Sequence, residues 1–236
     1  MTCEALTTRI RTANAEGRAA LGLFLIPGFP DWKTSVGAVT TAVGMGVDFI
    51  EFPVSTRPRW SQRTGSLIGQ TLADSTINLG AWSGPLKEWL SQAGLSIAIV
   101  YESAWPQSRQ WVAAKELHDI PAAIMLEADV KNYEGYAAKV SSWGSCLIPI
   151  VNGCAAELDE QGRCRLSVGQ GFVYVCMGSK TGQLSAGTTA LRHMVDLVRE
   201  RRPDLPVCCA FGLRTPDDVR RTRIISGCDG VIIGTG

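Results

Sequence analysis

The sequence predicts an α/β fold, a closed (β/α)8 TIM barrel formed by one domain. Two observations predict it: short apolar runs recur along the 236 residues, and helical patterns separate them. The runs are nearly continuous in apolar residues, as in parallel strands that are covered on both faces. An open doubly wound sheet is the alternative, but it normally shows a G-x-G-x-x-G motif after its first strand. Pro27-Gly28-Phe29-Pro30 does not match that motif.

Eight runs are expected to form the strands of the barrel. Neighbouring runs begin roughly one strand, one helix and two short loops apart, and a wider gap after the second run leaves room for an extra helix. The expected strands are Leu21–Pro27, Val47–Val54, Leu95–Tyr101, Ala122–Ala128, Cys146–Val151, Phe172–Met177, Leu205–Phe211 and Asp229–Gly234. We expect the domain to span residues 1–236 and the helix that would close a regular barrel to be lacking, because the sequence stops directly after the eighth run.

Two of the intervening helices have clear sequence signals. Thr215–Asp218 combines a capping hydroxyl, a proline at the first helical position and acids at the positive end of the helix dipole, and Gly227 is typical of a helix end. Apolar residues at positions i, i+3, i+4 and i+7 predict another helix with one buried stripe: Leu191, Met194, Val195 and Val198. A weaker stripe comprises Val36, Val39 and Val43.

Composition excludes several classes of protein. The net charge of +1 gives no electrostatic case for binding nucleic acid or an anionic membrane. No apolar stretch reaches the roughly 18 residues of a membrane span, and the N-terminus lacks the pattern of a signal peptide, so we expect a cytoplasmic protein. The eight cysteines contain no C-x-x-C pair and are expected to be small buried hydrophobes rather than a disulfide framework. With only two histidines, a His/Cys metal site is not expected.

Three glycine-rich loops follow the last three expected strands: Lys180-Thr181-Gly182, Phe211-Gly212-Leu213 and Gly234-Thr235-Gly236. Barrel enzymes carry their sites at the C-terminal ends of the strands, and a phosphate commonly lies on the loops after strands seven and eight. Glycine lets backbone N–H groups approach phosphate oxygens closely. One such loop would be a simple strand-to-helix turn, but the three together predict a phosphate site. Its expected ligands are Gly182, Gly212, Gly234 and Thr235.

Glu51 is the candidate catalytic residue. It lies in the second expected strand, flanked by apolar residues, and strand alternation places it on the same side as Phe49 and Pro53. A buried carboxylate is costly unless it is paired or used, and desolvation should raise its pKa toward the range of a general acid or base. A structural ion pair with an arginine is the alternative.

Several segments together resemble the α subunit of tryptophan synthase, over most of the chain. They are Leu23–Asp31, Gly46–Glu51, Tyr174, Ser179–Gly182, Ala210–Pro216 and Gly230–Gly236. The resemblance implies retro-aldol cleavage of indole-3-glycerol phosphate to indole and glyceraldehyde 3-phosphate, with no cofactor in this subunit. It also implies that Glu51 moves protons at the indole carbon and the glycerol hydroxyl. The implied indole pocket is apolar, as an indole requires: Phe24, Tyr101, Tyr174, Thr181, Phe211 and Ile232.

The loop after the second strand departs from that family. The family has an acidic loop there, with an aspartate that hydrogen-bonds the indole N–H, and the same loop contacts the β subunit. Here the loop has no carboxylate and three arginines, Arg57, Arg59 and Arg63. Losing the acceptor should cost transition-state stabilisation, although Glu102, Glu127 or Asp129 could replace it. The arginines suit an anionic substrate group beyond the phosphate, or form a solvated basic loop.

The leading hypothesis is therefore a lyase that cleaves a carbon–carbon bond in indole-3-glycerol phosphate or a related phosphorylated substrate. A second hypothesis is a catalytically weakened paralogue that binds a phosphorylated ligand or a partner subunit, such as a tryptophan synthase β-type subunit. A third is a different barrel aldolase, in which Lys180 forms a Schiff base instead of contacting phosphate.

Overall fold

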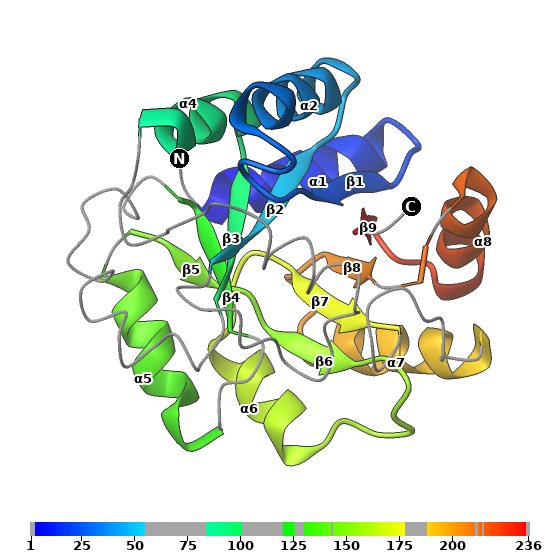
Figure 1. Cartoon of the computed structure of the whole chain (residues 1–236). Helices are drawn as coiled ribbons and strands as arrows, with labels where there is room; N and C mark the ends of the chain where they lie inside the picture. The colour runs from blue at the N-terminus through cyan, green and yellow to red at the C-terminus, as the bar shows by residue number, and fades with distance from the viewer. Residues whose placement is uncertain are drawn as a thin grey trace.

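A curled parallel sheet forms the centre of the computed structural model, with helices around its outside (Figure 1). The structure describes residues 3–54, 84–100, 120–125, 130–142, 144–177, 188–210, 212–213 and 215–234. The strands are β1 (Ala20–Phe24), β2 (Phe49–Val54), β3 (Ser96–Val100), β4 (Ala122–Met125), β5 (Cys146–Leu147), β6 (Ile150–Asn152), β7 (Val173–Cys176), β8 (Val207–Ala210) and β9 (Gly230–Ile233). The helices are α1 (Cys3–Ala15), α2 (Trp32–Gly44), α4 (Gly84–Ala93), α5 (Val130–Ser141), α6 (Glu160–Val168), α7 (Thr188–Arg201) and α8 (Pro216–Ser226).

The sheet closes into a barrel through the fifth expected strand. The strand order is β5-β4-β3-β2-β1-β9-β8-β7-β6, so its two end strands, β5 and β6, are consecutive in the chain. The N–H of Ile148 donates to Ala123 of β4 (2.9 Å), and the carbonyl of Pro149 accepts from Tyr174 of β7 (2.8 Å). The stretch Cys146–Asn152 therefore hydrogen-bonds to both β4 and β7. It is divided into two strands because Pro149 has no N–H to donate to a neighbouring strand. The predicted parallel barrel is confirmed.

Each of the eight expected runs overlaps an observed strand, usually a shorter one. The expected start of α8 is confirmed: Thr215 and Asp218 form a reciprocal capping box, and Gly227 ends the helix at a φ of 69°. All four residues of the stripe on α7 are buried. The weaker stripe on α2 is only partly right, since Val39 is buried but Val43 is exposed at the last turn.

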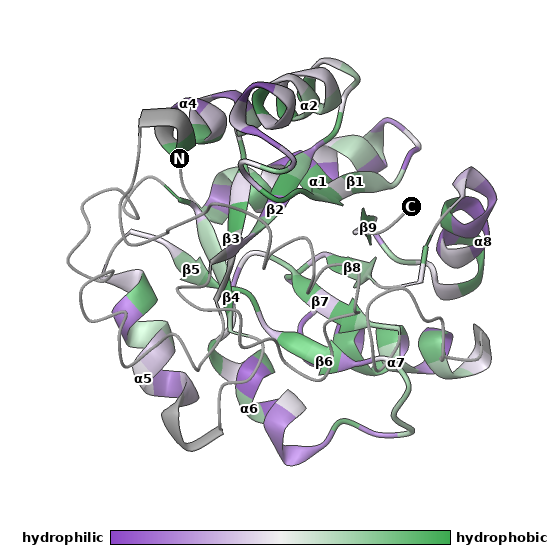
Figure 2. Ribbon diagram, in the orientation of Figure 1, coloured by the Kyte–Doolittle hydropathy of each residue, from purple (hydrophilic) through white to green (hydrophobic). Residues whose placement is uncertain are grey.

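Two apolar layers form the core. Side chains that alternate inward from the strands, such as Phe49, Ile124 and Phe172, fill the barrel. Outward side chains, such as Val175 and Val207, pack against the surrounding helices. Figure 2 shows hydrophobic residues along the strands and many hydrophilic ones on α6 and α8. The barrel interior is thus largely a packed core, and barrel enzymes build their sites toward the C-terminal ends of the strands.

Helix α1 was not expected from the sequence. Leu6, Ile10 and Ala13 are fully buried and belong to the same cluster as the barrel interior, so α1 covers one end of the barrel. Cys3 on this helix forms a disulfide with Cys146 of β5. The expectation that cysteines serve only as small hydrophobes is therefore wrong for this pair. Cys176, Cys208, Cys209 and Cys228 are buried thiols, as expected, whereas the thiol of Cys154 is exposed.

Two aspartates tie neighbouring strands together at the N-terminal end of the barrel. Asp48, just before β2, accepts hydrogen bonds from Leu21 N (2.8 Å) and from both terminal nitrogens of Arg18 (2.6 and 2.9 Å). Asp229, just before β9, accepts from Val207 N (2.7 Å) and from Arg199 (3.3 Å). In each case the aspartate accepts a hydrogen bond from a strand N–H, and an arginine balances its negative charge.

Candidate active site

Glu51 projects into the barrel from the middle of β2. Its neighbours Ile50 and Phe52 point outward and pack with residues of α4. Phe49 points inward and belongs to the apolar cluster that fills the barrel, here called the interior cluster. Because side chains alternate along a strand, Glu51 also points inward. The side chain is 1% exposed, and its Oε1 has no hydrogen-bond partner among the described residues. Burial alone raises the pKa of Glu51 from 4.5 to about 8. The carboxyl is therefore a mostly protonated acid near neutral pH.

Glu51 lies between two apolar neighbours on adjacent strands. It pairs in register with Phe24 on β1 and with Ile97 on β3. Phe24 is the last residue of β1 and packs against the interior cluster, and a Cβ on Gly234 would come within 3.5 Å of the Cβ of Phe24. The structure thus places the candidate acid on β2, one expected pocket residue on the adjacent β1, and one expected phosphate residue directly after the next strand, β9.

The expected phosphate loops after β8 and β9 begin side by side. Ala210 pairs with Ile232, and Gly212 and Gly234 each follow two residues later. Gly212 has a φ of 77°, a left-handed conformation that only glycine adopts without strain. Helix α8 begins soon afterwards, at Pro216, so its N-terminus lies at the same end of the barrel. Backbone N–H groups from adjacent loops near a helix N-terminus are suited to an anion.

Tyr174 and Ile232, two residues expected to line the indole pocket, belong to the apolar cluster inside the barrel. Tyr174 is 4% exposed and stacks on Phe172, with ring centroids 6.4 Å apart. The ring of Phe172 in turn packs against the ring of Phe49, with their centroids 5.6 Å apart. These rings form an apolar column inside the barrel.

Gly22 also contributes to this region, although it was not expected to do so from the sequence. A Cβ at this position would lie 2.3 Å from Cε2 of Phe49, so only glycine leaves room for that ring on the strand beside Glu51. A glycine inside an apolar strand is the signal that could have indicated this close approach.

The remaining expected site residues lie outside the described part of the chain. They are Arg57, Arg59, Arg63, Tyr101, Lys180, Thr181, Gly182, Phe211 and Thr235, together with the substitute acids Glu102, Glu127 and Asp129. Among the residues that the structure describes, no group of three or more histidine, cysteine or acidic side chains could hold a metal ion. In the same residues, no helix combines the length and the apolar character needed to cross a bilayer.

Comparison with known proteins decides the family. The family model described as "Tryptophan synthase alpha chain" matches residues 108–236, more than half of the chain. The chain belongs to the tryptophan synthase alpha chain family. Glu51 lies outside that match. Longer alignments with relatives of the family include it, since they cover almost the whole chain.

The relatives are distant. The tryptophan synthase alpha chain of Thermobifida fusca is 27% identical over 240 residues, covering 98% of this chain and 86% of that protein. The tryptophan synthase of Saccharomyces cerevisiae is 24% identical over 242 residues, and the match spans only 33% of its length.

Solved structures share the fold. Tryptophan synthase from Mycobacterium tuberculosis superposes with a TM-score of 0.81 at 21% identity, covering 97% of this chain and 88% of that one. The alpha subunit from Campylobacter jejuni superposes with a TM-score of 0.70 at 21% identity, covering 92% of this chain and 86% of that one. The barrel described above is thus the fold of this family.

Proposed function

We propose that the protein is a carbon–carbon lyase of the tryptophan synthase α type, which cleaves indole-3-glycerol phosphate or a related phosphorylated substrate. The observation that carries this proposal is Glu51, a protonatable acid in the barrel interior whose Oε1 has no hydrogen-bond partner among the described residues. Membership of the family supports the same reaction class.

The reaction requires one group that both gives and takes a proton. The bond between indole C3 and the glycerol chain breaks, C3 gains a proton, and the adjacent glycerol hydroxyl loses one to become an aldehyde. With a pKa of about 8, Glu51 is protonated in the resting protein and can first donate to C3. The carboxylate then formed accepts the hydroxyl proton, so the residue returns to its starting state without a cofactor.

The substrate's two ends fit the two sides of the site. Phe24, Tyr174 and Ile232 offer apolar contacts to an aromatic ring. Gly212 and Gly234 lie on the adjacent loops where a phosphate is commonly held in barrels. Gly182, Thr235 and Lys180 complete the proposed phosphate contacts, and Tyr101, Thr181 and Phe211 the apolar pocket.

A weakened paralogue is the second candidate, and the sequence of residues 55–63 favours it. That loop has three arginines and no carboxylate, so the acceptor for the indole N–H must come from elsewhere or be lost. Removing one such preorganised group costs about 3 kcal/mol, or roughly a hundredfold in rate. A β-type subunit remains a proposed partner, although the same loop alters the expected docking surface.

The test is to mix the protein with indole-3-glycerol phosphate, alone and with a tryptophan synthase β subunit, and to measure indole release. Glu51→Gln should lower turnover at least a hundredfold, because glutamine cannot transfer the proton. Glu88→Gln, an exposed change on α4, is the control and should leave turnover unaltered. Full turnover by Glu51→Gln would exclude the assigned role. Stabilisation by glycerol phosphate without turnover by the wild type would favour the paralogue.

A further inference from the structure

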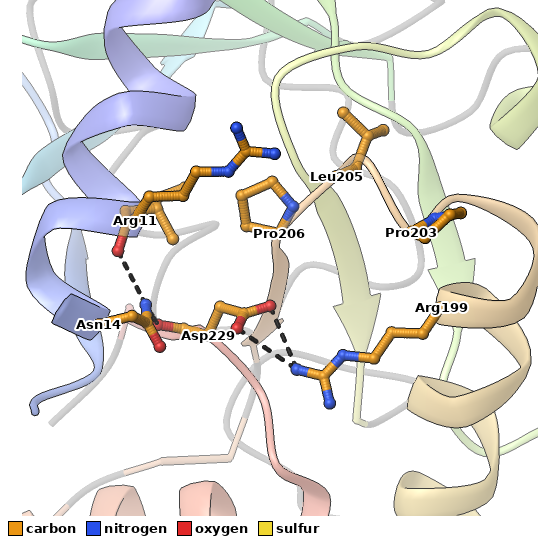
Figure 3. Close-up of a pocket in the computed structure, with 8 residues that line it drawn as sticks. Arg11, Asn14, Arg199, Pro203, Leu205, Pro206 and Asp229 are labelled. Atoms are coloured by element: carbon orange, nitrogen blue, oxygen red, sulfur yellow. Dashed lines mark hydrogen bonds and ion pairs between the residues drawn. The ribbon is translucent and has the colours of Figure 1, made fainter.

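A pocket lies at the opposite end of the barrel from the proposed active site. Its volume is about 310 Å³, and α1, the end of α7 and the segments that lead into β8 and β9 enclose it (Figure 3). Three apolar residues, Pro203, Leu205 and Pro206, line one wall. Arg11, Arg199 and Asp229 supply charged groups. Its volume is at the lower end of the range for small-molecule pockets, roughly 300–1,000 Å³.

The charges of this pocket do not cancel. Arg199 donates to both oxygens of Asp229 at 3.3 Å, and Asp229 also accepts from Val207 N, so this acid and this arginine neutralise each other. Arg11 donates to the backbone carbonyl of Asp204 at 2.6 Å, which carries no net charge. The carboxylate of Asp204 is held by Arg202 through two bonds of 2.9 Å, and the charge of Arg11 also helps to lower the pKa of Asp204. Three arginines, Arg11, Arg199 and Arg202, thus face the two carboxylates of Asp204 and Asp229, which leaves one net positive charge at the pocket.

We propose that this pocket binds a small carboxylic acid with an apolar ring or chain. A guanidinium pairs with a carboxylate in a planar, two-bond geometry, which assigns the acid group to Arg11. The wall formed by Pro203, Leu205 and Pro206 contacts the apolar body. One net positive charge matches a monoanion better than a phosphate dianion.

The pocket is joined to the proposed active site by two strands. β8 starts at Val207 and β9 follows Asp229, and the two strands lead to Gly212 and Gly234 at the other end. A ligand at the pocket would contact residues next to the start of both strands. The inference does not depend on lyase activity, because it concerns binding at a separate place.

The experiment uses benzoate as the probe, with benzamide and acetate as matched comparisons. Titrations of the full chain by calorimetry or NMR should show saturable binding of benzoate and much weaker binding of benzamide, which lacks the charge, and acetate, which lacks the ring. Arg11→Gln should weaken benzoate binding roughly tenfold, equivalent to 1.4 kcal/mol. Arg9→Gln, an exposed change on the same helix outside the pocket, should bind as the wild type does.

Three results would overturn the proposal. Wild-type protein that does not bind benzoate, or binds benzamide equally well, contradicts the role of the charge without using any variant. Undiminished binding by Arg11→Gln places the benzoate elsewhere, including at the Glu51 end of the barrel. The circular dichroism spectrum of Arg11→Gln should match that of the wild type, so that weaker binding can be assigned to the lost guanidinium and not to loss of the fold.

Discussion

Glu51 has a desolvation cost that links the candidate site to stability. The unfolded chain releases its proton near pH 4.5, while the folded protein retains it until about pH 8. Folding therefore favours the protonated state, and this residue's contribution to stability is lost as the pH rises through that interval. At about 1.4 kcal/mol for each pH unit between the two values, the full loss is on the order of 5 kcal/mol.

Glu51→Gln should remove most of this pH dependence. Glutamine does not ionise, so the variant's melting temperature should fall less than the wild-type value between pH 5 and pH 9. Differential scanning calorimetry at both pH values measures the difference, and comparing slopes cancels the constant cost of burying an amide. Glu88→Gln, which is exposed, should keep the wild-type slope. Parallel curves for Glu51→Gln and wild type would show that Glu51 is not buried and protonated.

Asp48 is a second buried acid whose loss should lower the stability of the fold. Asp48→Ala removes the paired bonds to Arg18 and leaves Leu21 N without its acceptor. We expect the free energy of unfolding to fall by about 2–4 kcal/mol, since Arg18 is partly exposed and can regain water but the N–H cannot. Urea denaturation measures this. Asp196→Ala breaks a half-exposed pair with Arg192 and should cost about 0.5 kcal/mol or less. Equal losses in both variants would contradict the argument.

At the scale of elements, α8 shows how local chemistry sets the length of a helix. Its start is held by the Thr215–Asp218 capping box and its end by Gly227, whose N–H donates to Arg223 at 2.8 Å. Both signals are short-range, which explains why the bounds of α8 could be predicted so closely. A helix placed in this way starts next to the proposed phosphate loops.

Gly227→Ala and Gly37→Ala should change stability in opposite directions. Gly227 has a left-handed φ of 69°, so alanine there should destabilise by about 1 kcal/mol. Gly37 is exposed within α2, and a methyl group there would meet no other atom within 4 Å, so alanine should stabilise by about 0.5–1 kcal/mol. Chemical denaturation of both variants makes the comparison. A stabilising Gly227→Ala would mean that the helix does not end there.

At the scale of the whole molecule, α1 and the disulfide connect parts of the chain that are far apart in sequence. Leu6 and Ile10 pack on the barrel interior, Thr7 Oγ1 donates to Gly171 at 2.7 Å, and Cys3 is bonded to Cys146. The cross-link spans 143 residues, so it restricts the unfolded chain strongly.

Cys3→Ser should lower the free energy of unfolding by about 2–4 kcal/mol under non-reducing conditions. A thiol reductant should abolish the difference from wild type, because both proteins then lack the cross-link. Cys154→Ser replaces an exposed free thiol and should have little effect under either condition. Peptide mapping without reductant should recover Cys3 and Cys146 joined. If both thiols alkylate freely in the unreduced, unfolded protein, the disulfide is absent.

The sequence alone determined the eight-stranded α/β architecture, the buried face of α7 and the side of its strand that Glu51 shares with Phe49. These follow from residue periodicity and cap chemistry, which act over a few neighbouring positions. The spacing of Leu6, Ile10 and Ala13 is also typical of a helix, so α1 too has a signal in the sequence.

Only the tertiary structure decided the features that depend on residues far apart in the chain. It showed how Cys146–Asn152 closes the sheet around Pro149, which cysteines pair, and which interior surface α1 covers. It also showed that Oε1 of Glu51 meets no hydrogen-bond partner among the described residues, where the sequence left an ion pair open. The alternation of side chains along a strand predicts which side chains share a face. The burial of a side chain and its hydrogen-bond partners are set only when distant segments of the chain pack together.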